Sequence, residues 1–296
     1  MTADATGARG IRDAGHHSSG NARWASDLAA TVFLALAFCA PHLARADTRL
    51  AIHYDISMIR VPIGQLSWAI DIGAASYSAS ANGKASGALN ALLNGEGRVA
   101  TRGVIAGEQL NPVFFSSNVT EDGETSGLQM TFENGAVKTL RVDAPLRNDS
   151  RIPITEAHRQ NVTDPLSAML IGAPAGEDLL APGRCQRVLA IFDGQRRYNL
   201  VLAFKRHDSI KIGAGYAGPA LICSVMLEPI AGYREDSMLV KYVGRQRDME
   251  IWFIPVPGTA IVAPVRLIMP TLIGTLEIAA DRYETVAPRP ATPASK

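Results

Sequence analysis

The stretch CQRVLAIFDGQRRYNLVLAF, residues 185–204, decides what kind of fold this chain adopts. An apolar run ends at Asp193-Gly194, two arginines follow, and apolar residues then alternate with others to the end of the stretch. Asp-Gly between two such runs is a strong signal for a β-hairpin, because both residues tolerate the positive φ angles of a tight turn. With a two-residue loop, Ile191 faces Arg196. The stretch therefore predicts an antiparallel hairpin.

The second arm of this hairpin sorts its side chains onto two faces. Neighbouring residues of a strand point to opposite faces, so the large apolar side chains share one of them, which we expect to be the core face. They are Tyr198, Leu200, Leu202 and Phe204. By the same rule Arg196 and Arg197 point opposite ways and do not form a clamp.

Short alternating runs separated by turn residues continue along the chain, as is typical of antiparallel sheet. Asn134-Gly135 predicts a type I′ turn between two alternating arms, and Asn82-Gly83 is a second candidate hairpin tip. Asp164-Pro165 predicts the start of a short helix, and residues 88–94 a shorter one. The sequence therefore predicts an all-β, mainly antiparallel fold: a curved sheet, half-barrel or β-roll with one or two short helices.

The first 46 residues have the pattern of a secretory signal peptide with an extended n-region. Arg23 precedes an apolar run of about thirteen residues, which is short for a membrane span, and Ala44-Arg45-Ala46 supplies an A-x-A cleavage site. We expect cleavage after Ala46, one periplasmic β domain over residues 47–284 and a disordered tail over 285–296. An uncleaved membrane anchor is the alternative, and lipidation of Cys39 is disfavoured because bulky Phe38 precedes it.

The charge of the expected mature chain is balanced. The whole sequence has 29 basic and 28 acidic residues, and four arginines and three aspartates precede residue 47, which leaves 25 of each. A neutral protein gives no reason to expect nucleic acid or a strongly anionic surface as its partner. No second apolar run is long enough for a membrane helix, so we expect no membrane span after signal removal.

Two cysteines remain after the signal, Cys185 and Cys223. In an oxidising compartment an even pair predicts a disulfide, here tying the hairpin to the strand that follows it. A metal pair or a catalytic thiol is the competing interpretation. A metal would need further ligands, and no histidine or cysteine lies at ligand spacing beside either residue.

Enzyme signatures are weak throughout the sequence. The segment GAGYAG at 213–218 matches a dinucleotide-binding fingerprint, but a strand-like run follows it where a helix must begin, so we interpret it as a glycine-rich turn. Only His53, His158 and His207 remain in the mature chain, and no metal motif or G-x-S-x-G elbow occurs. We therefore expect no cofactor and no metal, and we assign no catalytic residue.

The apolar run MEIWFIPVPGTAIVAPVRLIMPTLIG, residues 249–274, is apolar on both alternating faces. Either protein covers both faces, or one face lines an apolar cavity. For the second case we expect a ligand-lining set and a head-group set. The lining residues would be Trp252, Phe253, Leu267, Tyr198 and Phe204, and the head-group residues would be Arg196 or Arg197.

Several separated segments resemble the domain-of-unknown-function 3108 family of exported Gram-negative proteins. They are YDISMIRVPIG, DPLSAML, CQRVLAIFDGQRRYNL, YAGPALIC, EPIAGY and MEIWFIPVPGTAIVAPVRL, in that order over about residues 50–280. The resemblance implies a periplasmic all-β domain. It brings no established activity and no catalytic residues.

Three functions follow as hypotheses. The first is a periplasmic cell-envelope protein that binds an apolar or amphipathic ligand, such as a lipid, in a curved sheet. The second is an interaction or assembly module with a packed core, whose partner is another envelope protein and which holds no small ligand. The third, a hydrolase whose site one sequence does not reveal, is disfavoured by the scarcity of histidine.

Overall fold

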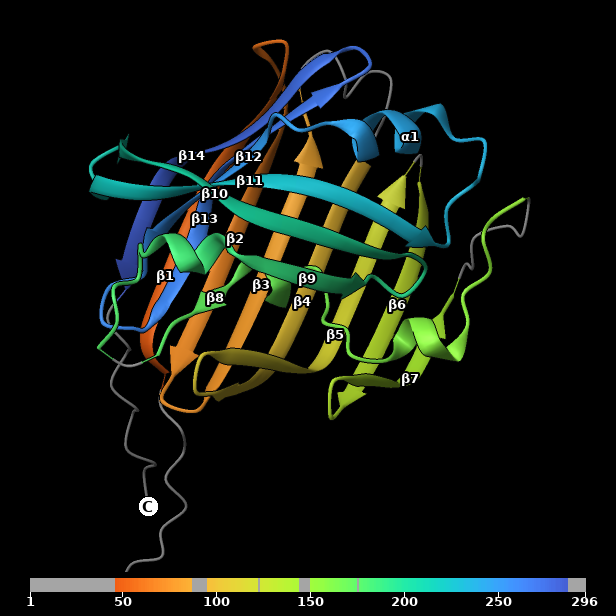
Figure 1. Ribbon diagram of the computed structural model, residues 1–296, viewed down its shortest axis with the longest axis horizontal. Helices are drawn as coiled ribbons and strands as arrows, with labels where there is room; N and C mark the ends of the chain where they lie inside the picture. Colours follow the sequence, from red (N-terminus) through yellow and green to blue (C-terminus); the bar gives the residue numbers. More distant parts are fainter. Residues whose placement is uncertain (1–45, 87–94, 122, 144–149, 175, 287–296) are drawn as a thin grey trace, which may run out of the picture. The chain divides into compact units, whose positions relative to one another are not determined.

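The computed structural model describes residues 46–86, 95–121, 123–143, 150–174 and 176–286. They form one 14-stranded antiparallel sheet that is not closed into a barrel (Figure 1). Its strands are β1 (Ala46–Met58), β2 (Val61–Gly73), β3 (Ser76–Ala85), β4 (Gly95–Ala106), β5 (Gln109–Glu121), β6 (Glu124–Glu133), β7 (Ala136–Val142), β8 (Ile171–Gly172), β9 (Arg187–Phe192), β10 (Arg197–Ile212), β11 (Tyr216–Ala231), β12 (Met249–Pro255), β13 (Ile261–Thr271) and β14 (Gly274–Val286). The predicted fold class is confirmed.

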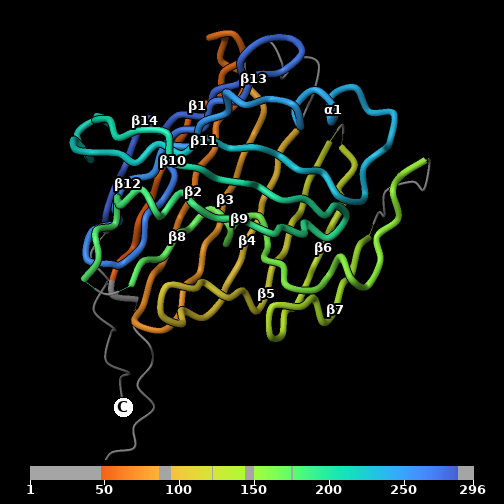
Figure 2. Tube along the Cα trace, viewed as in Figure 1, coloured from red at the N-terminus to blue at the C-terminus, as the bar shows by residue number. Residues whose placement is uncertain are grey.

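Two meanders make up the sheet, and its first and last strands join them. The strand order runs from β7 back to β1, continues into β14 and runs back to β9, with β8 beside β13. β9, β10 and β11 cross in front of β2 to β6 (Figures 1 and 2). Trp68 of β2 and Met130 of β6 share one buried cluster with Phe192 of β9 and Trp252 of β12. The main core therefore lies between two layers of the same curled sheet.

A connecting segment, residues 150–163, lies between the two edges of the sheet. Its Val162 N–H donates to the carbonyl oxygen of Gly135, at the tip of the β6–β7 hairpin, at 2.9 Å. The next residue, Thr163, exchanges hydrogen bonds with β9, where its N–H donates to Ala190 O at 2.9 Å and its carbonyl accepts from Phe192 N at 3.0 Å. The segment thus stands where direct pairing of β7 with β9 would close a barrel.

A second core explains why the sequence of β12 is apolar on both faces. Trp252 and Ile254 face the main core, whereas Ile251 and Phe253 belong to a second cluster on the other side of the strand. Helix α1 (Met238–Arg245) and a 3₁₀ turn at Pro182–Cys185 contribute Val243 and Cys185 to this second cluster. Protein therefore covers both faces of β12.

The predicted disulfide joins Cys185 to Cys223, with their Cα atoms 5.4 Å apart. The hairpin in the deciding stretch is also present, but its register differs from the prediction. Ile191 pairs with Tyr198 rather than with Arg196, because the turn takes four residues, 193–196. The physical cause is the Asp193 side chain, whose Oδ1 accepts hydrogen bonds from the backbone N–H groups of Gln195 and Arg196 at 2.8 and 2.6 Å.

Among the other turns, Asn134 and Gly135 have the positive φ angles, 53° and 76°, that the sequence predicts. The prediction of a hairpin tip at Asn82-Gly83 is wrong, because both residues lie inside β3 and pair with strands on either side. The first half of the GAGYAG segment, residues 213–215, is a turn between β10 and β11, as expected, and its second half, 216–218, belongs to β11.

The helix predicted after Asp164 is a single 3₁₀ turn, Ser167–Met169, and α1 was not predicted. The second predicted helix, at 88–94, lies outside the described residues, as do residues 1–45 of the expected signal peptide and residues 287–296 of the expected tail. The first two residues of that expected tail, 285 and 286, are instead the end of β14. In the part of the chain that the structure describes, no helix combines the length and apolarity needed to cross a membrane.

Candidate functional site

A buried carboxylate network holds the segment after Thr163 against the inner face of the sheet. Asp164 is 0 % exposed, and its Oδ1 accepts hydrogen bonds from the backbone N–H groups of Leu166 and Ser167, both at 2.9 Å. Its Oδ2 accepts from the hydroxyls of Ser167 at 2.5 Å and Thr101 at 2.9 Å. Tyr77 donates to Ser167 Oγ at 2.7 Å. Strands β3 and β4 are thereby tied to this segment.

The network satisfies its members but does not present a nucleophile. Burial raises the pKa of the Asp164 carboxyl, and the hydrogen bonds from Ser167 and Thr101 oppose that rise. A serine hydroxyl that donates to a buried carboxylate has the arrangement of a nucleophile and its base. Ser167, however, is only 2 % exposed, so no substrate reaches its oxygen in this structure. The network therefore acts as an anchor for the segment.

A cavity of about 290 Å³ opens beside the anchor, on the inner face of the sheet. Its apolar lining comes from β4, β5, β6 and the anchored segment, as Val99, Phe115, Val119, Leu128, Pro165 and Leu166. Its polar lining comes from β5, β6 and the β9–β10 turn, as Ser117, Ser126, Asp193, Gln195 and Arg196. The volume is at the lower end of the ~300–1,000 Å³ typical of ligand pockets.

The β9–β10 turn is fitted closely against the wall of this cavity. Gly194 has a φ of 96°, and a Cβ atom on it would lie 2.2 Å from Cδ1 of Leu128, so a larger residue would strain the backbone and displace the Leu128 side chain. Arg196 lies beside the turn's own carboxylate, with its Nη1 at 3.5 Å from Oδ2 of Asp193. This contact is long for a hydrogen bond and leaves the guanidinium capacity for a further anion.

Two phenols lie near the same carboxylate. Burial and, after it, the negative charge of Asp193 raise the pKa of Tyr233 to about 12. Burial and then Asp193 raise the pKa of Tyr198 as well. Both side chains therefore stay neutral at physiological pH, and the charges at this end of the cavity are those of Asp193 and Arg196.

The five side chains that the sequence suggested as ligand-lining do not gather at one place. Trp252 faces the main core, and Phe253 and Leu267 pack in the second cluster. Phe204 is 36 % exposed, with its ring centroid 5.1 Å from that of His207. Tyr198 lies on β10 opposite Ile191. Their role in ligand binding stays a prediction.

The two arginines that the sequence suggested for a head group are placed differently. Arg196 lines the inner cavity. Arg197 turns back onto its own strand, where its Nη1 donates to the carbonyl oxygen of Tyr198 at 2.5 Å and to Oδ1 of Asn199 at 2.8 Å. Only Arg196 is therefore in a position to meet a molecule in that cavity.

A second buried carboxylate, Glu250, belongs to an ionic cluster beside Trp252. Arg206 donates two hydrogen bonds to its two oxygens at 2.8 and 3.1 Å, and Lys205 Nζ lies 2.8 Å from Oε1. The indole N–H of Trp252 donates to Oε2 at 3.0 Å, and the Arg266 guanidinium lies 5.1 Å from the Trp252 ring centroid. These donors, led by Arg206, lower the pKa of Glu250 to about 2.

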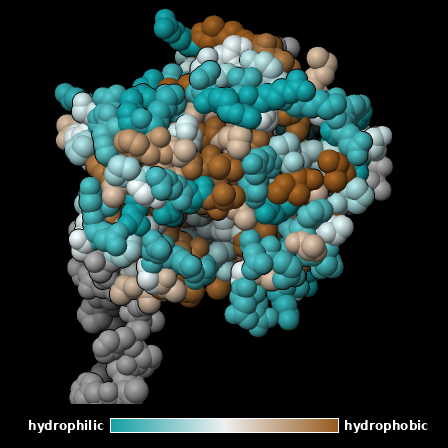
Figure 3. All heavy atoms as spheres, in the orientation of Figure 1, coloured by the Kyte–Doolittle hydropathy of each residue, from teal (hydrophilic) through white to brown (hydrophobic). Residues whose placement is uncertain are grey.

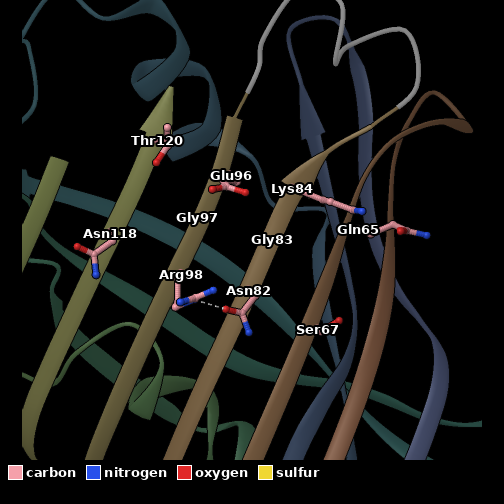
Figure 4. Close-up of a pocket in the computed structure, with 10 residues that line it drawn as sticks. All are labelled: Gln65, Ser67, Asn82, Gly83, Lys84, Glu96, Gly97, Arg98, Asn118 and Thr120. Carbon is pink, nitrogen blue, oxygen red and sulfur yellow. Dashed lines mark hydrogen bonds between the residues drawn. The ribbon is translucent and has the colours of Figure 1, made fainter. Parts of the chain in front are cut away.

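A polar pocket of about 530 Å³ lies on the outer face of β2 to β5 (Figure 4). Lys84, Glu96 and Arg98 line it together with side-chain amides and hydroxyls, and Arg98 Nε donates to Oδ1 of Asn82 at 2.8 Å. Its floor contains Gly83 and Gly97, which pair with each other across β3 and β4. This pocket has no apolar wall, so a ligand bound there would bury little apolar surface. The inner cavity is therefore the better candidate for a ligand site.

Metal-ligating groups do not cluster within the described ranges, where no three His, Cys, Asp or Glu side chains are placed to hold an ion. His53 Nδ1 lies 2.9 Å from Ser67 Oγ, and His207 Nε2 lies 2.7 Å from the carbonyl oxygen of Leu180. Each ring is thus held by a separate local partner.

Comparison with known proteins identifies the family. The model of a family described as "Protein of unknown function (DUF3108)" matches residues 52–281. The chain belongs to this family. No curated protein matches it. Among solved structures, it is similar to a "Beta-barrel-like Protein of Domain of Unknown Function DUF1849 from Brucella abortus", with 11 % identity, a TM-score of 0.49, and coverage of 82 % of this chain and 99 % of that one.

Sequence reasoning missed the anchor formed by Tyr77, Thr101, Asp164 and Ser167. A local signal for part of it exists, because Asp164 followed by Ser167 places an acceptor three residues before a donor, as at a helix N-terminus. Thr101 and Tyr77 lie 63 and 90 residues away from their partners, and no local pattern connects them.

Proposed function

We propose that this DUF3108 protein binds an apolar or amphipathic molecule in the cell envelope. The ligand's apolar part lies in the inner cavity, and a negatively charged or polar end meets Arg196. The observation that carries this proposal is the composition of the cavity, whose apolar walls come from three strands and the anchored segment and whose charged groups come from the β9–β10 turn. Apolar walls with a few placed polar groups are the usual features of small-molecule sites.

The anchor supports the proposal because it fixes one wall of the cavity. Pro165 and Leu166 line the cavity directly after Asp164, whose four hydrogen bonds hold the backbone there. A wall that is ordered before the ligand arrives lowers the entropy cost of binding.

Two observations support a location in the envelope. The Cys185–Cys223 disulfide is the kind of bond that persists in oxidising compartments such as the periplasm. The N-terminal sequence has the basic, apolar and small-residue order of a cleaved export signal.

Binding of a fluorescent amphiphile tests the proposal. The purified protein, stripped of lipid by solvent extraction and refolded with its disulfide oxidised, is titrated with dansyl-undecanoic acid, and decanoic acid is used as competitor. Ser117→Phe fills the inner cavity, and its matched control, Ser116→Phe, adds the same ring one residue away on the outer face. We expect Ser117→Phe to weaken binding at least about tenfold and Ser116→Phe to leave it within about twofold.

The position of the polar end is tested separately. Arg196→Gln should weaken binding of decanoic acid about tenfold and leave binding of decanol unchanged, because only the acid offers a carboxylate to the guanidinium. A wild-type protein that binds neither probe, and that carries no amphiphile in native mass spectrometry, would overturn the proposal and favour an envelope interaction module with a packed core.

A further inference from the structure

Two neighbouring hairpins carry large aliphatic side chains at their turns. The two-residue turns Ile59-Arg60 and Leu272-Ile273 join β1 to β2 and β13 to β14. Because β1 pairs with β14 up to Met58 and Leu276, the two turns lie at the same end of the sheet (Figure 1). The Ile59 N–H donates to the carbonyl oxygen of Thr275 at 2.9 Å, which links the first turn to the start of β14, directly after the second turn.

We name Ile59, Arg60, Val61, Leu272 and Ile273 the aliphatic tip. Its four apolar side chains are 62, 53, 51 and 70 % exposed, in the order Ile59, Val61, Leu272 and Ile273. Figure 3 shows hydrophobic atoms gathered at the top of the molecule, where Figure 1 places the ends of these hairpins. Single exposed apolar residues are common on proteins, but a contiguous group marks a contact surface.

The backbone of the tip departs from the usual chemistry of turns. Ile59 and Arg60 have φ angles of 51° and 66°, the pattern of a type I′ turn, which Asn-Gly normally occupies. Positive φ is unfavourable for a β-branched residue, and here it places an isoleucine in water. Gly274 makes room for that isoleucine, since a Cβ atom on Gly274 would lie 2.4 Å from Ile59 Cγ1. Local rules broken in this way concentrate at functional sites.

We infer that the aliphatic tip inserts into the interface of a membrane that contains anionic lipids. The side chains protrude from turns rather than line a groove. A lipid bilayer can accommodate such protruding apolar groups because its acyl chains rearrange around them. Arg60, at the centre of one turn, is placed for a lipid phosphate while the neighbouring aliphatic groups enter the acyl boundary. Four aliphatic residues and one cation predict reversible binding, sensitive to lipid charge. This inference does not depend on the inner cavity.

Vesicle co-sedimentation tests the inference with the protein that starts at Asp47, after the expected cleavage, because the apolar run of the signal peptide would bind vesicles by itself. One set of vesicles contains phosphatidylethanolamine and phosphatidylglycerol, and the other contains phosphatidylcholine alone. We expect Leu272→Ser/Ile273→Ser to lower the partition coefficient at least about tenfold. The control Val104→Ser/Val188→Ser changes two residues that are 46 and 57 % exposed on β4 and β9, and it should leave binding unchanged.

Arg60→Ser separates the charge from the apolar contact. It should remove most of the preference for phosphatidylglycerol and leave binding to phosphatidylcholine nearly unchanged. Circular dichroism and the disulfide content establish that each variant is folded. The inference is overturned if the folded wild type binds neither vesicle, or if both serine double variants lose binding equally. A wild-type dimer that dissociates in Leu272→Ser/Ile273→Ser, without vesicle binding, would instead make the tip a contact between copies.

Discussion

Asp164 and Glu250 are both buried carboxylates, and the protein stabilises them in opposite ways. Asp164 receives its hydrogen bonds from hydroxyl and backbone N–H groups, and burial raises its pKa. Glu250 receives a bidentate pair from Arg206 and a contact from Lys205, which lower its pKa to about 2. Neutral donors satisfy the geometry of a carboxylate without compensating its charge, whereas cations do both.

Asp164→Ala should have the largest effect on stability, because it removes the carboxylate that accepts from the N–H groups of Leu166 and Ser167 and from the Ser167 hydroxyl. The Thr101 hydroxyl keeps the carbonyl oxygen of Phe114 within reach at 3.1 Å. We expect a loss of about 3 kcal/mol in the free energy of unfolding, measured by urea denaturation with the disulfide intact. Asp164→Asn keeps one acceptor oxygen and should lose about 1 kcal/mol. The control is Asp178→Ala, which removes one hydrogen bond near the surface, donated by Leu180 N. If both alanine variants lose the same free energy of unfolding, the Asp164 network is no stronger than a single surface hydrogen bond.

Glu250→Gln should lose about 1.5 kcal/mol, since it weakens charge-assisted hydrogen bonds but leaves Arg206 and Lys205 partly in water. Thermal and urea unfolding both report this change. Glu277→Gln, which removes a charge from the more exposed pair with Arg266, serves as the control and should lose less than about 0.5 kcal/mol. If the two variants are equally destabilised, the Glu250 cluster is no stronger than a surface ion pair.

The pH dependence of the two variants should have opposite signs. The folded pKa of Asp164 is raised, so the wild type loses stability relative to Asp164→Asn as pH rises through the unfolded value of about 3.9 toward that raised pKa. The folded pKa of Glu250 is about 2, so its contribution is present above the unfolded value, about 4.3, and is lost as pH falls toward 2.

Urea unfolding between pH 3 and 7 measures both trends. We measure the difference in free energy of unfolding between the wild type and Asp164→Asn, and between the wild type and Glu250→Gln. Each difference should change by on the order of 1 kcal/mol over this range, in opposite directions, after allowance for solvent screening. Two curves of the same sign would show that the surroundings of the two carboxylates do not differ as described.

Thr101→Val should have the smallest effect, about 0.5–1 kcal/mol, because Asp164 keeps three of its four donors. The matched substitution Thr139→Val acts on an exposed threonine pair with Thr131 and should change stability by less than about 0.3 kcal/mol. If Thr101→Val leaves the free energy of unfolding unchanged, the anchor is stabilised by the hydrogen bonds from Ser167 and the backbone rather than by Thr101.

The comparison also shows which parts of the molecule a sequence reveals. Asn134 and Gly135 readily adopt positive φ angles, so the turn at these residues could be predicted. The disulfide could be predicted because only two cysteines remain after the expected signal peptide. The register of the β9–β10 hairpin could not, because the side chain of Asp193 competes with a two-residue turn for the same backbone N–H groups. At Asn82-Gly83 the pairing of β3 with both neighbours overrides the local turn signal.

The candidate site was harder to predict from the sequence than the fold, because the residues that form it lie far apart along the chain. Arg196 was proposed from the sequence and lines the inner cavity, but the strands that form the opposite wall lie about 70 to 100 residues earlier in the sequence. Trp252 and Phe253 were predicted to line a ligand site because β12 is apolar on both faces. Two covered faces and a cavity leave the same pattern in one sequence, and only the three-dimensional arrangement separates them.

The pairing of β1 with β14 has a consequence for how the chain acquires its fold during synthesis. Each meander assembles from hairpins between neighbours in the sequence, which form early because their loops are short. The contact between Arg49 and Val286 closes a loop that includes nearly the whole domain, so the seam between β1 and β14 forms only after the C-terminal strand has emerged. Until then β1 is an edge strand that pairs only with β2, and a chaperone that protects its free edge would act at the step where aggregation competes with folding.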